Sequence, residues 1–239
     1  MITALTTDRL ILREYNDADI DDYFRLKSDK ETMYYLQDIQ LFSQEEANAD
    51  FANILADMKC EDRKFYFFHI ELKETHEQVG SVGYTVVDNT PRGKIVHAGY
   101  FIYPKFWSEG YVTEAFKKVL EYAFTENDVY RVTTGCLAEN IGSEKVMIKC
   151  GLIKEAEHLD WEWHDGKMKT RLEYRLLKNE WQGQQWKVNN ETKISVICSV
   201  DVLIFLRYTL SKIKCIADAE TTRDVGYNKY SGHKDNDRD

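Results

Sequence analysis

Over the first 181 residues, apolar side chains recur every second residue in some segments and every three or four residues in the segments between them. Alternation every second residue predicts strands over 9–14, 65–72, 79–87, 94–103, 131–137, 153–161 and 169–177. Apolar residues three or four positions apart predict helices from Asn16 or Asp17 to about Lys27, after Ser43, over 110–124 and over 142–150. Strands and helices interleaved in this way favour one α/β or α+β domain over a sandwich or a helix bundle.

Local signals delimit several of these elements. Ser43 precedes Glu46 by three residues, which is the spacing of a helix-capping box. Gly151 is a natural stop for the helix over 142–150. The polar runs 88–93 and 164–166 predict turns between strands.

The last part of the chain has a different pattern. From Ile194 to Leu210 the even positions are apolar, which predicts a strand, yet the same segment also fits a helix. From Asp218 onward the chain is polar and has no apolar period. We therefore divide the sequence into a domain over 1–181, an extension with a strand and/or helix over 182–217, and a mobile polar tail over 218–239.

Composition and charge narrow the function classes. Of 239 residues, 43% are hydrophobic and 31% are charged, so the chain can bury a sizeable core. The net charge of −9 argues against a nucleic-acid-binding surface and favours a positively charged substrate or partner. The first residues lack the pattern of a secretion signal, and no apolar run is long enough for a membrane helix. We expect a cytoplasmic protein without a membrane partner.

Cysteine and histidine spacing gives no sign of a metal. The five cysteines are scattered and form no Cys-x-x-Cys pair, and the six histidines never follow a ligand spacing such as His-x-x-x-His. We expect free, buried thiols in a reducing compartment and no metal.

A strand, a short turn and a helix start follow one another over residues 99–115. A turn that leads into a helix N-terminus leaves backbone N–H groups unpaired, and these can bind a phosphate. Gly110 would permit its close approach. By itself this signal is weak, because a glycine before a helix is more often only a turn.

The residues around this turn are more specific. Gly99-Tyr100-Phe101-Ile102 and Trp107 through Ala115 resemble the acetyl-CoA-binding motif of the GNAT superfamily of N-acetyltransferases. The most similar branch contains ribosomal-protein N-terminal acetyltransferases and spermidine acetyltransferases. Further matching segments are Thr7 through Arg13, Asn140-Ile141-Gly142-Ser143, Lys149-Cys150-Gly151-Leu152 and Leu176 through Trp181. The resemblance covers about residues 5–181 and implies a mixed, mostly antiparallel sheet flanked by helices, followed by a C-terminal extension.

The resemblance also implies how acetyl-CoA would bind as co-substrate. Backbone N–H groups of Phe101 and Ile102 would polarise the thioester oxygen. Asn140 and Ser143 would contact the pantetheine arm, while Asn140 could equally be only the cap of the following helix. The pyrophosphate would lie on the backbone amides of Glu109, Gly110, Tyr111, Val112 and Thr113.

Two side chains are candidates for proton transfer. His97 stands where the family often has a glutamate, and it could take a proton from the attacking amine. Alternatively, it is an ordinary half-exposed strand residue. Ser143 could return a proton to the departing thiolate, and the alternative donors are Tyr100, Tyr103 and Tyr111. Trp161, Trp163 and His164 could line the acceptor pocket or belong to the core or a dimer surface.

Several alternatives remain at this level. The acceptor is either a protein N-terminus or a small cationic amine, and a homodimer could form through the segment after Ile194. The sequence departs from the family pattern at Ser108-Glu109 and at Val112. These departures favour the competing hypothesis, a non-catalytic acyl-CoA-binding or interaction module with the same fold.

Overall fold

The structure is a computed structural model that describes residues 2–187. The chain divides into two units, Met1–Gln182 and Gly183–Asp239, and the fold below is that of the first. The predicted apolar alternation from Ile194, the predicted polar tail over 218–239 and the cysteines Cys198 and Cys215 all lie outside the described residues.

The N-terminal part consists of two short strands and two helices, β1 (Leu5–Thr6), β2 (Leu10–Glu14), α1 (Ile20–Ser28) and α2 (Gln44–Asp57). Asn16 begins the first helical segment as predicted, but a 3₁₀ turn, η1 (Asp17–Asp19), precedes α1. Ser43 caps α2, because its side chain accepts a hydrogen bond from the Glu46 N–H at 3.2 Å. A second 3₁₀ turn, η2 (Gln37–Ile39), lies between the helices.

Three long antiparallel strands form the middle of the sheet, β3 (Phe65–Leu72), β4 (Gln78–Thr90) and β5 (Gly93–Ile102). The turn predicted over 88–93 is shorter in the structure, since Asp88 and Asn89 still pair with β5. A register shift near residue 87 lets the ladder continue there, so the polar residues belong to the strand. Gly93 ends the turn with φ +116°, a conformation that favours glycine.

The second half contains η3 (Pro104–Phe106), α3 (Tyr111–Thr125), β6 (Val129–Leu137), α4 (Ile141–Lys149), β7 (Ile153–His164) and β8 (Lys167–Leu177). The hairpin strands β7 and β8 are longer than predicted and meet at Asp165 and Gly166, which both have positive φ. A further helix begins at residue 178, and its Trp181 stacks on Phe124 of α3 with 5.4 Å between the ring centroids.

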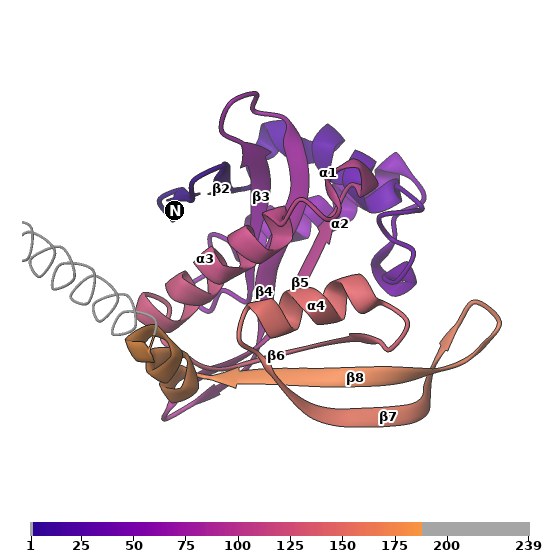
Figure 1. Ribbon diagram of the computed structural model, residues 1–239. Coiled ribbons are helices and arrows are strands. Elements are labelled where there is room, and N and C mark those ends of the chain that lie inside the picture. Colours follow the sequence, from indigo (N-terminus) through magenta and orange to yellow (C-terminus); the bar gives the residue numbers. More distant parts are fainter. Residues whose placement is uncertain (1, 188–239) are drawn as a thin grey trace, which may run out of the picture. The chain divides into compact units, whose positions relative to one another are not determined.

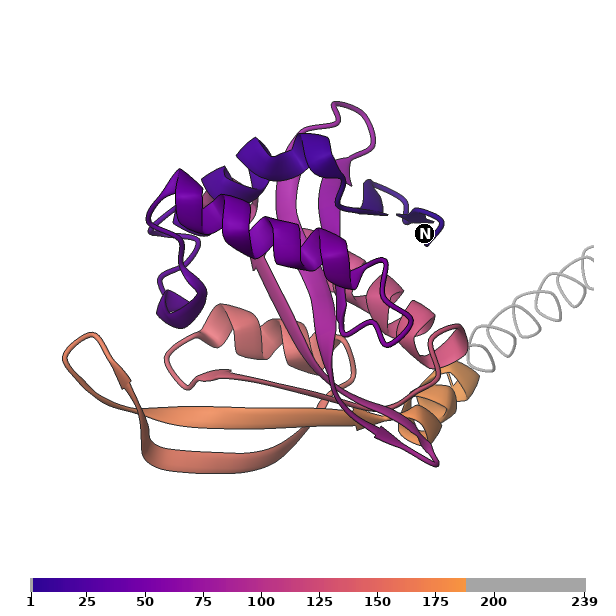
Figure 2. The same cartoon turned by 180° about the vertical axis from the view of Figure 1, so that it is seen from behind.

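The eight strands form one sheet in the order β1-β2-β3-β4-β5-β6-β8-β7, and only β5 and β6 are parallel. Helices α3 and α4 cover one face (Figure 1), and α1 and α2 cover the other (Figure 2). The main core lies between α3 and the sheet, where Phe116, Val119 and Ala123 meet Val96 and other inward residues of the strands. The predicted mixed, mostly antiparallel α/β architecture is therefore confirmed.

None of the helices between residues 2 and 187 combines the length and the apolar character that a membrane crossing requires.

Candidate active site

The parallel contact between β5 and β6 is short. The paired residues run from Lys94 opposite Val129 to His97 opposite Thr133, and no residue of β5 after His97 pairs with β6. Beyond that point β5 stays paired with β4, and β6 stays paired with β8. The two halves of the sheet consequently separate, as Figure 1 shows for β5 and β6. Backbone groups of both strands are left facing the opening.

The ladder between β4 and β5 decides which amides face the opening. The Tyr103 N–H donates to the Val79 carbonyl at 3.1 Å, and the same register continues through Phe101 opposite Ser81. Hydrogen-bonding direction alternates along an antiparallel strand. The N–H of Phe101 is thus directed to β4, while that of Ile102 is directed toward the opening. Of the two amide donors predicted, only Ile102 has the required direction.

Helix α3 begins without a side-chain cap. Its N-cap residue is Gly110, at φ +80°, and it follows Ser108, at φ +65°. The first N–H groups of the helix, including those of Tyr111, Val112 and Thr113, have no acceptor within the helix. Because the helix dipole adds positive potential there, this turn fits a phosphate group.

Glu109 is exposed in this turn, so its carboxylate can remain in water. A cation, Arg9, just before β2, contacts this turn, and the sequence analysis did not identify it as a site residue. Its Nη1 donates to the Glu109 carbonyl at 3.1 Å, and its guanidinium lies 4.3 Å from the centre of the Tyr111 ring. Arg9 and Glu109 are 100 positions apart, so no local spacing could reveal this contact.

Asn140 and Ser143 lie at the start of α4. The Asn140 side chain accepts from the Ser143 N–H at 3.1 Å, so the predicted cap is confirmed. The Tyr100 hydroxyl donates to the Ser143 carbonyl at 3.0 Å and lies 2.9 Å from Ser143 Oγ. Burial raises the pKa of Tyr100 above its ordinary value. The two hydroxyls form a hydrogen-bonded pair between β5 and α4.

A cysteine shares this region. Cys136 of β6 is buried, and its Sγ lies 3.9 Å from the Asn140 carbonyl oxygen. Burial raises the pKa of the thiol to about 11, so the thiol is neutral near pH 7. The described cysteines Cys60, Cys136 and Cys150 are all free, but Cys60 is exposed, so the expectation of a buried thiol is wrong at that position.

His97 lies where β5 and β6 separate, and its side chain is exposed. Its Nδ1 is 3.3 Å from Thr133 Oγ1, whose own hydroxyl hydrogen is donated to the Val96 carbonyl at 3.0 Å. The threonine oxygen can then only accept from the ring, which places the neutral imidazole's hydrogen on Nδ1. The lone pair is left on Nε2, which suits this nitrogen to accept a proton.

The surroundings keep His97 neutral. Desolvation by nearby protein atoms lowers the pKa of the ring below its ordinary value, although Glu173 opposes this effect. Glu173 of β8 was also missed by the sequence analysis. Its carboxylate packs against Gly135 of β6, because a Cβ at position 135 would lie 2.8 Å from Glu173 Oε2. Arg171 holds the other oxygen, with its Nε 2.6 Å from Glu173 Oε1.

The predicted aromatic group at the hairpin is divided in the structure. Trp161 and Trp163 are exposed, whereas His164 is buried. His164 stacks on Tyr35 with 5.7 Å between centroids, and the Tyr34 hydroxyl lies 3.4 Å from Asp165 Oδ2. The segment between α1 and α2 therefore contacts the tip of the β7–β8 hairpin.

Three possible metal ligands, Asp19, Asp22 and His69, have ligand atoms within 4.8 Å of one another. No sequence spacing could predict this group, because its members come from separate elements. Both oxygens of Asp19 already accept from Arg13 at 2.7 Å. The group is an ion-pair cluster that fixes η1 to the sheet.

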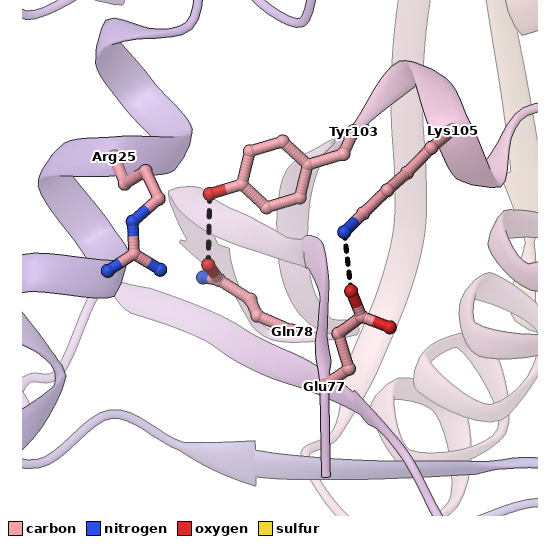
Figure 3. A pocket seen from close by; sticks show the side chains of 5 residues that line it. All are labelled: Arg25, Glu77, Gln78, Tyr103 and Lys105. Carbon is pink, nitrogen blue, oxygen red and sulfur yellow. Dashed lines mark hydrogen bonds and ion pairs between the residues drawn. The ribbon is translucent and has the colours of Figure 1, made fainter. Parts of the chain in front are cut away.

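A small cavity of about 180 Å³ lies beside α1 and the start of β4 (Figure 3). Of the residues considered in the sequence analysis, its lining contains Tyr103, one of the alternative proton donors. Tyr103 donates to Gln78 Oε1 at 3.1 Å, and Lys105 pairs with Glu77 at 2.5 Å. Burial raises the pKa of Tyr103 to about 12. Lys105 is thus paired on this side rather than directed to the turn before α3.

Comparison of the sequence with known proteins identifies a family. Residues 9–153 match a family model described as an acetyltransferase (GNAT) domain. The uncharacterized N-acetyltransferase p20 of Bacillus licheniformis is 29% identical over 181 residues, which are 75% of this chain and 99% of that protein.

Two solved structures share the fold. The spermidine N-acetyltransferase of Vibrio cholerae, in complex with CoA and spermine, aligns with a TM-score of 0.65 at 16% identity, over 74% of this chain and 99% of the other. The ribosomal-protein-S5-alanine acetyltransferase of Vibrio fischeri aligns with a TM-score of 0.64 at 17% identity, over 75% and 99%. Since the family model spans more than half of the sequence, the chain belongs to the GNAT family of acetyltransferases and is an enzyme of that class.

Proposed function

We propose that this enzyme transfers an acetyl group from acetyl-CoA to a primary amine, which attacks the thioester carbonyl directly. The acceptor is either a protein N-terminus or a small cationic amine. The observation that carries this proposal is the opening between β5 and β6 in a fold whose α3 begins at an uncapped turn. A strand edge and a helix N-terminus together suit a long ligand that carries a pyrophosphate at a distance from its reacting group.

Different groups of the protein would hold the pyrophosphate, the pantetheine arm and the thioester of acetyl-CoA. The amides of residues 109–113 would bind the pyrophosphate, and Asn140 and Ser143 would contact the pantetheine arm. The Ile102 N–H would donate to the thioester oxygen as negative charge develops on it.

Proton transfer would use both sides of the opening. An ammonium group cannot attack, so the acceptor must first lose a proton. His97 Nε2, which carries the lone pair, would accept it. The negative charge of Glu173 would stabilise the imidazolium that forms, against the opposing charge of Arg171. The hydroxyl pair of Ser143 and Tyr100 would supply a proton to the departing thiolate.

Charge and relatives support the acceptor class. The chain has a net charge of −9, which favours cationic partners. The similar Vibrio enzymes are a spermidine N-acetyltransferase and a ribosomal-protein-S5-alanine acetyltransferase, and each of these acceptors carries an amine.

A non-catalytic acyl-CoA-binding module is the second candidate. It is favoured by Val112, which stands where the family has a smaller residue, and by the acidic Glu109 in the turn. Glu109 is exposed, and the repulsion between exposed charges in water is about 1 kcal/mol or less. The catalytic function therefore remains the better supported proposal.

Calorimetric titration with acetyl-CoA tests cofactor binding, and Gly110→Leu is the critical variant. Leucine at φ +80° strains the turn, and its side chain would start 3.6 Å from Arg9 Nη2. The matched control is Gly166→Leu, because Gly166 has a similar φ of +75° in an open hairpin turn. We expect micromolar binding by the wild type, about tenfold weaker binding by Gly110→Leu, and no change in the control.

Failure of the wild type to bind millimolar acetyl-CoA would contradict the proposal. Binding without acetylation of any amine tested would instead favour the non-catalytic module.

A further inference from the structure

Arg9 contacts the turn before α3 at several points. Besides the Glu109 carbonyl and the Tyr111 ring, its Nε lies 2.7 Å from Glu114 Oε2, and its Nη2 lies 2.7 Å from the same oxygen. The guanidinium thus connects the residue before the N-cap of α3 with the first turn of the helix. One side chain contacts two positions of the segment that would bind the pyrophosphate, Glu109 and Tyr111, and the residue that follows this segment, Glu114.

The contact with the Glu109 carbonyl has a geometric consequence. A trans peptide is planar, so its N–H points opposite to its C=O. By holding the Glu109 oxygen, Arg9 directs the Gly110 N–H away from itself. This peptide would otherwise be free to rotate, because glycine allows many backbone conformations.

Glu114 keeps Arg9 in place. Its carboxylate accepts from the Thr7 hydroxyl at 2.5 Å and from the Arg9 backbone N–H at 3.0 Å. Burial opposes ionisation of Glu114, but these hydrogen bonds and the Arg9 charge hold its pKa below the ordinary value. The ion pair therefore persists at neutral pH.

The guanidinium is still available to a ligand. Its side chain is 45% exposed. The contacts with Glu109 and Glu114 use three of its five N–H bonds, which leaves two without an acceptor among residues 2–187.

We propose that Arg9 is a positioning residue for the diphosphate of acetyl-CoA: it fixes the Glu109–Gly110 peptide and the Tyr111 ring, so that the amides of the turn converge on the ligand. This inference rests on the proposed function. It attributes part of the affinity for acetyl-CoA to a residue that lies 100 positions before the turn in the sequence.

The test compares two acetyl donors. Acetyl-CoA contains the diphosphate, and S-acetylpantetheine lacks it. For Arg9→Met we expect KM for acetyl-CoA and the calorimetric Kd for CoA to rise about tenfold, with kcat changed less than twofold. With S-acetylpantetheine, kcat/KM should be unchanged.

Three further variants make the result specific. Arg9→Lys keeps the charge but not the planar fork, so its Kd for CoA should lie between those of the wild type and Arg9→Met. Glu114→Gln weakens the ion pair that holds Arg9 in place without truncating any side chain. This variant replaces Arg9→Met in the test if Arg9→Met does not fold. Arg92→Met is the matched control, because Arg92 also lies over a tyrosine ring, that of Tyr130, but in the β4–β5 turn. It should bind CoA like the wild type.

The outcomes separate the inference from the proposed function. Equal Kd values for the wild type and Arg9→Met, or equal losses with both donors, would overturn the role of Arg9 and leave the proposed function intact. A wild type that does not bind CoA would overturn both.

Discussion

At the residue scale, the two candidates for proton transfer lie on different elements, His97 on β5 and Ser143 on α4. His97 is oriented by Thr133 of β6. Ser143 belongs to α4 and meets the hydroxyl of Tyr100. Each role can therefore be tested by itself.

Replacing His97 by alanine should lower kcat by about a hundredfold, the usual contribution of a general base. The pKa of His97 lies below its ordinary value, so the wild-type rate should rise with pH through a limb below about pH 6.5 and then level off. The variant should lose this limb. The measurement is the pH dependence of kcat, with His158→Ala of β7 as control. An unchanged profile would leave His97 as an ordinary strand residue.

Replacing Ser143 by alanine should lower kcat about tenfold if its hydroxyl protonates the thiolate. Tyr100→Phe is the companion variant, since it removes the other hydroxyl of the pair. Steady-state kinetics with acetyl-CoA distinguish the two roles of Ser143. An intact kcat with a raised KM would remove the acid role and retain the contact with acetyl-CoA.

At the element scale, α2 depends on a local cap. The Ser43 side chain accepts from the Glu46 N–H, so Ser43→Ala should reduce the free energy of unfolding by about 1 kcal/mol. Urea denaturation measures the change. Ser28→Ala, at the C-terminal end of α1, is the control and should change the free energy by less than about 0.5 kcal/mol. Equal effects of both substitutions would mean that the cap contributes nothing.

The elements also show how far the sequence is informative. Residues 65–72 form a strand over the predicted range, because alternation and β-branched or aromatic side chains act locally. The β4–β5 turn was predicted too long, since polar residues of an exposed strand resemble those of a loop. The segment before α1 forms a 3₁₀ turn that is closed locally by a capping box between Asn16 and Asp19. The additional ion pair between Asp19 and Arg13 depends on the position of β2, which no local pattern contains.

At the scale of the whole molecule, carboxylates with lowered pKa values make stability depend on pH. Hydrogen bonds and ion pairs hold the pKa values of Asp19, Asp50, Glu71 and Glu114 below ordinary values, against the opposing effect of burial. Their stabilisation is fully present above the unfolded-state pKa of about 4 and is lost as pH falls through the lower folded-state values.

The urea midpoint should therefore be steady at neutral pH and fall below about pH 4. Arg13→Met removes a partner shared by Asp19 and Glu71, so its midpoint should depend less on pH in this range. Asp21→Asn, at an exposed position of α1, should retain the wild-type dependence. A wild-type midpoint independent of pH down to about 3 would contradict the expectation.

The proposal of a homodimer concerns the segment after Ile194, outside the described residues. If that segment pairs two chains, deletion of residues 190–239 should convert a dimer into a monomer, as judged by the mass in solution relative to the mass of the shortened chain. An unchanged oligomeric state and melting temperature would dismiss the proposal.

The sequence by itself determined the order of strands and helices, the helix start at Gly110 and the family, because periodicity, capping and a contiguous motif all act over short distances along the chain. Only the tertiary structure decided which groups meet at the site. Arg9 reaches Glu109 across 100 positions, and His97 reaches Thr133 across 36. It also placed Glu173 over Gly135 and directed the Phe101 N–H to β4 rather than to the opening. Such contacts follow from strand register and from the separation of the sheet, which depend on the packing of the whole domain.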